Sequence, residues 1–119
     1  MFPDAPSANR GDATLTVTIR TQGKDTLPQG SSIVVTLADI SKNLSNPLPI
    51  AGDTVHMSQP DQKIRVSVPT DRAQINICRK ANVCGLYVRV VKNGRVLLGN
   101  RAPVPYRAGQ KLLTITVSA

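Results

Sequence analysis

The two cysteines are the residues of this chain best suited to covalent chemistry. Cys78 and Cys84 lie six positions apart in a sequence of 119 residues. Two thiolates fall short of the four ligands of a structural zinc site, and the only histidine, His56, is remote from them in the sequence. The spacing therefore favours a disulfide that closes a short loop, which would place the protein in an oxidising compartment. Two buried free thiols are the alternative.

The remaining polar residues form no recognisable catalytic pattern. His56 lies in a weak strand segment, and we interpret it as a surface or strand-edge residue. Asp39 and Ser41 could suggest a catalytic pair, but Asp and Ser at a strand end commonly hydrogen-bond the backbone where the chain turns. The sequence contains no phosphate-binding glycine loop and no HExxH helix motif. We therefore expect no enzymatic activity, no cofactor and no metal site.

Positive charge gathers in the second part of the sequence. Residues 1–71 contain six Lys/Arg and seven Asp, whereas residues 72–119 contain nine Lys/Arg and no acid. This asymmetry indicates an electropositive side and an anionic partner, such as lipid headgroups, nucleic acid or an acidic protein segment; a solubilising surface is the alternative. The three aromatic residues, Phe2, Tyr87 and Tyr106, are too few to stack nucleic-acid bases, so we expect no nucleic-acid partner.

The elements that position these residues are predicted to be β-strands. Val, Ile and Thr, whose branched side chains suit a pleated sheet, supply 31 residues, and the helix former Glu is absent. Alternating apolar and polar residues predict strands at 14–20, 32–40, 50–57, 63–68, 74–78, 85–92, 95–99 and 112–117. Asn93-Gly94 predicts a type I′ hairpin turn between two of them, whereas Pro103-Val104-Pro105 breaks the pattern.

These strands predict an all-β fold, a single β-sandwich or partly closed barrel of seven to eight mostly antiparallel strands at residues 13–119. Residues 1–12, rich in proline and polar residues, are expected to form a flexible N-terminal tether. The sequence has no run of 18 apolar residues that would predict a membrane span.

Several strands are also apolar on their second face. These residues are Val34, Tyr87, Val91, Leu112 and one of Leu97 or Leu98. A sheet face that only meets water would not need them. They are therefore either covered by the chain itself or exposed as a groove for a partner.

The order of several motifs resembles the YbaY/YscW group of small bacterial lipoproteins. Residues 35–41, Val-Thr-Leu-Ala-Asp-Ile-Ser, resemble the group's "VTLxDxS" signature. Residues 66–69, Val-Ser-Val-Pro, with Asp71 after them, are similar to its strand that ends in proline before an aspartate. Residues 85–90 and 93–98 are similar to its hairpin, and a final alternating strand completes a resemblance that spans residues 13–118.

This resemblance implies a β-sandwich that acts as a secretin pilot protein, or pilotin, of a type III (YscW-like) or type II (AspS-like) secretion system. Such a protein binds the C-terminal segment of a secretin subunit, escorts it to the outer membrane and promotes its assembly into a ring, without catalysis or a cofactor. The resemblance also implies a lipid anchor on an N-terminal cysteine, at the periplasmic face of the outer membrane. This sequence begins at Met1 without that cysteine, so the anchor is expected in the full-length precursor.

Two other functions remain open for a domain of this kind. One is a general envelope lipoprotein of the same fold with an unknown ligand, and the other is an OB-like nucleic-acid-binding module. In the pilotin interpretation the domain is expected to be a monomer whose protein partner is the secretin segment.

The contact residues for that partner are predicted from the strand pattern alone. The second apolar face suits an amphipathic helix that lies in a groove. The predicted groove is lined by Val34, Tyr87, Val91, Leu97 and Leu112 and rimmed by Arg89, Lys92 and Arg95.

Overall fold

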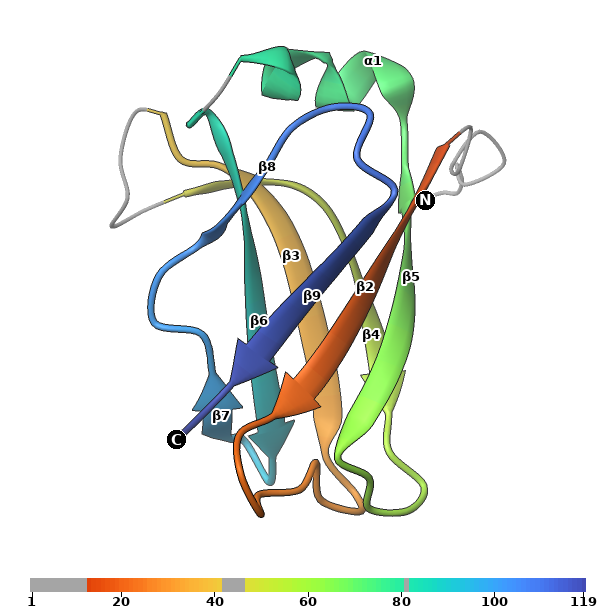
Figure 1. Ribbon diagram of the computed structural model, residues 1–119, viewed down its shortest axis with the longest axis vertical. Coiled ribbons are helices and arrows are strands. Elements are labelled where there is room, and N and C mark those ends of the chain that lie inside the picture. Colours follow the sequence, from red (N-terminus) through yellow and green to blue (C-terminus); the bar gives the residue numbers. More distant parts are fainter. Residues whose placement is uncertain (1–12, 42–46, 81) are drawn as a thin grey trace.

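Two β-sheets pack face to face in the computed structural model, which describes residues 13–41, 47–80 and 82–119 (Figure 1). One sheet has the strand order β5-β2-β9, and the other has the order β4-β3-β6-β7 with β8 also paired to β6. The elements are β2 (Ala13–Thr21), β3 (Ser32–Asp39), β4 (Leu48–His56), β5 (Lys63–Thr70), α1 (Arg72–Ile75), the 3-10 helix η1 (Asn76–Arg79), β6 (Cys84–Lys92), β7 (Arg95–Gly99), β8 (Val104–Tyr106) and β9 (Leu112–Val117).

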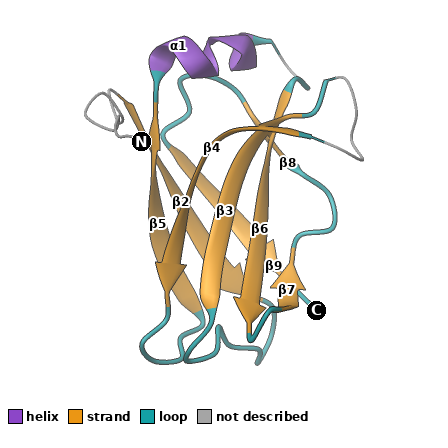
Figure 2. Cartoon of the chain, turned by 180° about the vertical axis from the view of Figure 1, so that it is seen from behind, coloured by secondary structure: helices purple, strands orange, loops and turns teal. Residues whose placement is uncertain are grey.

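This architecture confirms the all-β sandwich. All strand pairs are antiparallel except β2 with β9, which run parallel. Figure 1 shows the molecule from the side of the three-stranded sheet, and Figure 2 shows it from the opposite side, with the five-stranded sheet in front. In both figures α1 lies at the same end of the sandwich. The expected tether at residues 1–12 lies outside the described residues. None of the helices in the described part is long and apolar enough to cross a membrane.

The core lies between the sheets, where alternate residues of each strand point inward. Leu15 and Val17 from β2 face Val35 and Leu37 from β3 and Val88 from β6, and each is at most 1% exposed. Burying a side chain of this size contributes about 1.5–3 kcal/mol to the stability of the fold. The period-two pattern predicted these inward positions.

The segment 74–78 forms helical turns, so the strand predicted there is wrong. The Asp71 carboxylate caps α1 by accepting a hydrogen bond from the Ala73 amide (2.8 Å), as Asp commonly does at a helix N-cap. Ile75 and Cys78 are buried, three residues apart on one helical face, whereas Ile77 is 47% exposed. The apolar spacing of Ile75 and Ile77 mimicked a strand, but the cap decides the local structure.

A second correction concerns Val104–Tyr106, which is strand β8 although prolines flank its first residue. Its partner is the start of β6, with Tyr106 opposite Cys84. Proline is tolerated there because β8 lies at the sheet edge. The segment that leads into β8 can pack this closely against β6 because residue 85 is a glycine. A Cβ atom on Gly85 would lie 2.6 Å from Pro103 Cβ.

Asn100 fills the gap between β7 and β8, which both pair with the same edge of β6. Its Oδ1 accepts a hydrogen bond from the Val88 amide (2.7 Å), and its Nδ2 donates to the Leu86 carbonyl oxygen (2.9 Å). Nδ2 also donates to the carbonyl oxygen of Ala102 (2.9 Å). One side-chain amide therefore takes the place of a missing strand residue and continues the hydrogen-bond ladder of β6.

Candidate functional site

The structure gathers only part of the predicted groove on one surface. Val34, Tyr87, Arg89 and Val91 lie on the outer face of β3 and β6, where Val34 is paired with Arg89. A hollow of about 270 Å³ opens on this face and is lined by Thr36, Ala38, Pro47, Pro49, Tyr87 and Arg89. The outer face thus offers a small depression whose described lining has one aromatic ring and one cation, rather than a long trough.

The other four predicted groove residues lie elsewhere. Leu112 is on the outer face of the opposite sheet and is 74% exposed. Leu97 is the extra residue of a β-bulge in β7 and packs against the core, so Val96 occupies the position opposite Val91. Lys92 and Arg95 pair beside the Asn93-Gly94 turn, at the hairpin end. Strand periodicity assigns a residue to a face of its own strand, but it does not show which sheet that strand joins.

The residues considered for catalysis have structural surroundings. His56 is exposed on the edge strand β4, and its Nδ1 lies 2.9 Å from the Ser32 hydroxyl. Asp39 accepts hydrogen bonds at Oδ1 from the amide (2.9 Å) and the hydroxyl (2.6 Å) of Ser41, which confirms the predicted polar corner. Within the described ranges, no group of three or more His, Cys, Asp or Glu could hold a metal ion.

The cysteines join the helical segment to the five-stranded sheet. A disulfide links Cys78 in η1 to Cys84, the first residue of β6, and both side chains are fully buried. It holds η1 against one end of the sandwich, where a cavity opens.

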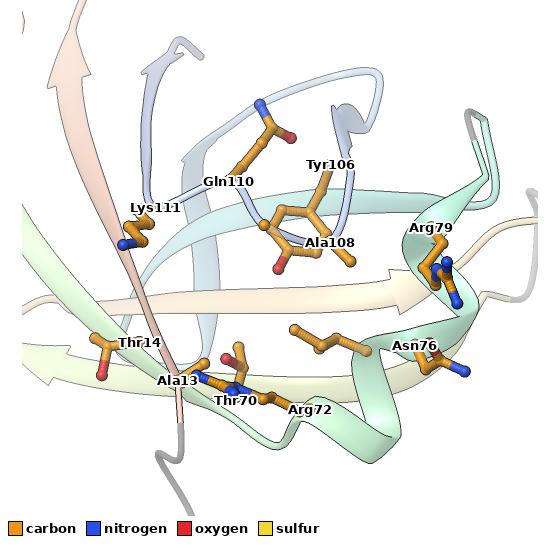
Figure 3. Close-up of a pocket in the computed structure, with 12 residues that line it drawn as sticks. Ala13, Thr14, Thr70, Arg72, Asn76, Arg79, Tyr106, Ala108, Gln110 and Lys111 are labelled. Carbon is orange, nitrogen blue, oxygen red and sulfur yellow. The ribbon is translucent and has the colours of Figure 1, made fainter.

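This cavity, here called the end pocket, has a volume of about 700 Å³ (Figure 3). It lies where β5 ends and β2 begins, and its walls are α1, η1 and the loop between β8 and β9. The lining residues are Ala13, Thr14, Thr70, Arg72, Ile75, Asn76, Arg79, Tyr106, Ala108, Gly109, Gln110 and Lys111. The sequence analysis did not identify this site.

The walls of the end pocket are tied together by hydrogen bonds to backbone carbonyl oxygens. The Ala108 amide donates to the Cys78 carbonyl oxygen (3.0 Å), and Arg107 Nη2 donates to the Arg79 carbonyl oxygen (3.1 Å). On the other side, the Thr16 amide donates to the Lys111 carbonyl oxygen (2.8 Å). The loop is therefore fixed to both η1 and β2, so the pocket is formed before any ligand arrives.

The electrostatics of the end pocket are one-sided. Arg72, Arg79 and Lys111 line it, and no acid is among its described lining residues. Asp71 is the neighbour of Arg72 in the chain, but it is not part of the lining, and its carboxylate is engaged in capping α1. Ile75 adds an apolar surface to this basic wall. The pocket therefore suits a ligand that carries both a negative charge and an apolar group.

Two buried hydroxyl groups also line the end pocket. Tyr106 and Thr70 are each 2% exposed. Neither side-chain hydroxyl forms a hydrogen bond to another residue in the described part of the chain. Burial raises the pKa of the Tyr106 phenol, because it disfavours the charged form. Since most buried polar side-chain atoms have a partner, two unpaired hydroxyls in one pocket mark a place where a ligand could supply acceptors.

Alkaline pH should destabilise the protein partly through Tyr106. The raised pKa means that the unfolded chain loses this proton first, so the free energy of unfolding falls as the pH rises from the ordinary value of 10.0 towards the folded-state pKa. Urea unfolding between about pH 8 and pH 11 should show a steeper fall for the wild type than for Tyr106→Phe. Tyr87→Phe should keep the wild-type slope, and identical slopes for all three proteins would contradict this prediction.

Comparison with known proteins finds a similar fold but no matching sequence. No protein-family model and no curated protein matches this chain. Its fold matches the solved structure of an alternative pilotin from the type II secretion system of Vibrio cholerae, with a TM-score of 0.73. The likeness covers 88% of this chain and 94% of that protein at 15% sequence identity. The predicted pilotin-like fold is thereby confirmed, whereas membership of the YbaY/YscW group stays a prediction.

Proposed function

We propose that this protein is a pilotin, which binds the C-terminal segment of a secretin subunit and promotes its outer-membrane targeting and ring assembly. The shared fold with a type II pilotin, with a TM-score of 0.73 over 88% of this chain, is the observation that carries the proposal. Because that neighbour belongs to a type II system, a type II secretin is the first partner to test, and a type III secretin is the second.

Several features of the molecule support a binding role rather than catalysis. The described residues offer a preformed basic pocket and a shallow outer hollow, and their one histidine is an exposed residue beside a serine hydroxyl. The Cys78–Cys84 disulfide fits an oxidising compartment such as the periplasm. In this proposal, a lipid anchor supplied by the full-length precursor holds the domain at the periplasmic face of the outer membrane.

Titration of secretin peptides tests the proposal. A synthetic peptide from the C-terminus of a type II secretin should bind in the micromolar range, a binding free energy of about −8 kcal/mol, and should gain helicity on binding. Isothermal titration calorimetry measures the affinity, and circular dichroism measures the helicity. A scrambled peptide of the same composition is the control. If folded protein gives neither heat nor a spectral change with type II or type III peptides, the pilotin role is wrong.

Substitution of the outer face tests the contact residues predicted from the strand pattern. If Val34, Tyr87 and Val91 contact the segment, Tyr87→Ala should weaken peptide binding about tenfold, because a buried aromatic contact is worth roughly 1–2 kcal/mol or more at an interface. Leu112→Ala on the opposite sheet is the matched control and should leave the affinity unchanged. Equal affinities for the wild type and Tyr87→Ala would remove the outer face from the interface.

A further inference from the structure

We propose that the end pocket binds the terminal α-carboxylate of the partner segment together with the apolar side chain beside it. This inference rests on the proposed function, because it names the place where the end of the secretin segment would be held. A C-terminal segment necessarily carries this carboxylate, whatever its sequence. The described lining of the end pocket has the positive charge and the apolar surface that suit such a group.

The donors of the end pocket come from different walls. Arg79 extends from η1 on one side, and Lys111 lies on the opposite side, at the start of β9 (Figure 3). The phenol of Tyr106 lies between them, and Thr70 belongs to the floor below. A carboxylate accepts several hydrogen bonds at once, and those from Arg and Lys are strengthened by charge.

The two unpaired hydroxyls favour a ligand oxygen over an apolar occupant. Tyr106 and Thr70 are almost fully buried and lack hydrogen-bond partners among the described residues, which is an unfavourable state for a hydroxyl in a protein interior. A carboxylate between them would accept a hydrogen bond from each. An apolar side chain in the same position would leave both unpaired.

The size of the end pocket favours the end of a peptide over a small free anion. Its volume of about 700 Å³ lies within the range of roughly 300–1,000 Å³ typical of ligand sites. Ile75 and Ala108 provide an apolar surface that a bare ion would not use. The outer hollow is smaller, at about 270 Å³, and Arg89 is the cation in its described lining. Charge, volume and unpaired donors therefore all favour the end pocket over the outer hollow.

A pair of peptides that differ only at the terminus tests this inference. The secretin C-terminal peptide is prepared as the free acid and as the C-terminal amide, and both are titrated calorimetrically into the wild-type protein. The amide removes one negative charge with little change in shape. The free acid should bind about tenfold or more tightly than the amide, because hydrogen bonds to a charged group are the stronger ones.

Protein variants test whether the end pocket causes the difference in affinity between the free-acid peptide and the amide. Tyr106→Phe removes only the hydroxyl, and Arg79→Gln removes one positive charge; each should weaken free-acid binding about tenfold and shrink the difference between acid and amide. Lys63→Gln removes one charge at the opposite end of β5 and is the matched control, expected to keep the wild-type ratio. Thermal unfolding of each variant checks that it is folded. Tyr106→Phe should be at least as stable as the wild type, because the hydroxyl it loses has no hydrogen-bond partner among the described residues.

The outcomes separate this inference from the proposed function. If neither peptide binds, the pilotin role fails and the inference fails with it. If both bind equally well, the protein binds the segment but the terminal carboxylate is not its anchor, and the inference alone is overturned. A peptide whose affinity falls on Asp→Asn exchange but not on amidation would assign the pocket to a side-chain carboxylate, which also overturns the inference as stated.

Discussion

Replacing Asn100 with aspartate should lower the free energy of unfolding by about 3 kcal/mol, through the loss of two donated hydrogen bonds and the repulsion that replaces them. The side-chain amide of Asn100 donates to the carbonyl oxygens of Leu86 and Ala102, both 2.9 Å away. A carboxylate of the same shape would place a negative oxygen against both acceptors. The Val88 amide would keep its acceptor, so the lost donors account for the effect.

Urea unfolding at neutral pH measures this change. Gln59→Glu is the matched control, because it makes the same amide-to-carboxylate exchange at an exposed position and should change the stability by less than about 0.5 kcal/mol. The destabilisation from Asn100→Asp should shrink as the pH falls below about 4, since the new carboxyl then regains a proton to donate. Equal stabilities for the two variants would show that Asn100 is dispensable to the β6 ladder.

Removing the disulfide with the double substitution Cys78→Ala and Cys84→Ala should lower the free energy of unfolding by about 2–4 kcal/mol. Loop closure over so few residues accounts for about 2 kcal/mol, and the loss of two fully buried sulfur atoms adds the rest. Binding should suffer as well, because Arg79 follows Cys78 directly and lines the end pocket. The free-acid peptide should therefore bind at least about fivefold more weakly to the double variant at a temperature where it is folded.

Hydrogen exchange and thiol labelling check this prediction independently of binding. Amides of residues 72–80 should exchange faster in the double variant, whereas those of β2 in the core should keep their relative protection. The wild-type protein, denatured without reductant, should offer no thiol to an alkylating reagent, and two after reduction. Two reactive thiols before reduction would show that the bond is absent, and unchanged exchange at residues 72–80 would show that it does not hold η1.

Every described strand except β8 could be predicted, because each of them has its own local signal. Val17 and Val35 alternate with polar neighbours, and the positive φ angles of Asn93 (53°) and Gly94 (75°) match the hairpin turn expected from their side chains. The helical turns at 72–79 were missed because Ile75 and Ile77 imitate a strand over a very short stretch. The Asp71 cap just before them was the signal that could have revealed the helix.

The end pocket could not be predicted, because its residues come from several segments that only the tertiary structure brings together. Thr14 starts one strand, Thr70 ends another, and Lys111 precedes a third. No periodicity links such positions. The sequence did carry one relevant signal, the absence of acids after residue 71, and Arg72, Arg79 and Lys111 belong to that excess of positive charge. The charge pattern predicted an electropositive surface but not its place.

The parallel pairing of β2 with β9 has a consequence for when the chain can fold. Val17 lies opposite Leu113, so the central strand of the three-stranded sheet is completed by residues far away in the sequence. Contacts this distant in the sequence are slow to form, typically on a timescale of about milliseconds to seconds for all-β domains. Until β9 is in place, one edge of β2 lacks its hydrogen-bonding partner, so the three-stranded sheet is incomplete. Completion of this sheet by β9 is therefore expected to be a late and slow step in folding.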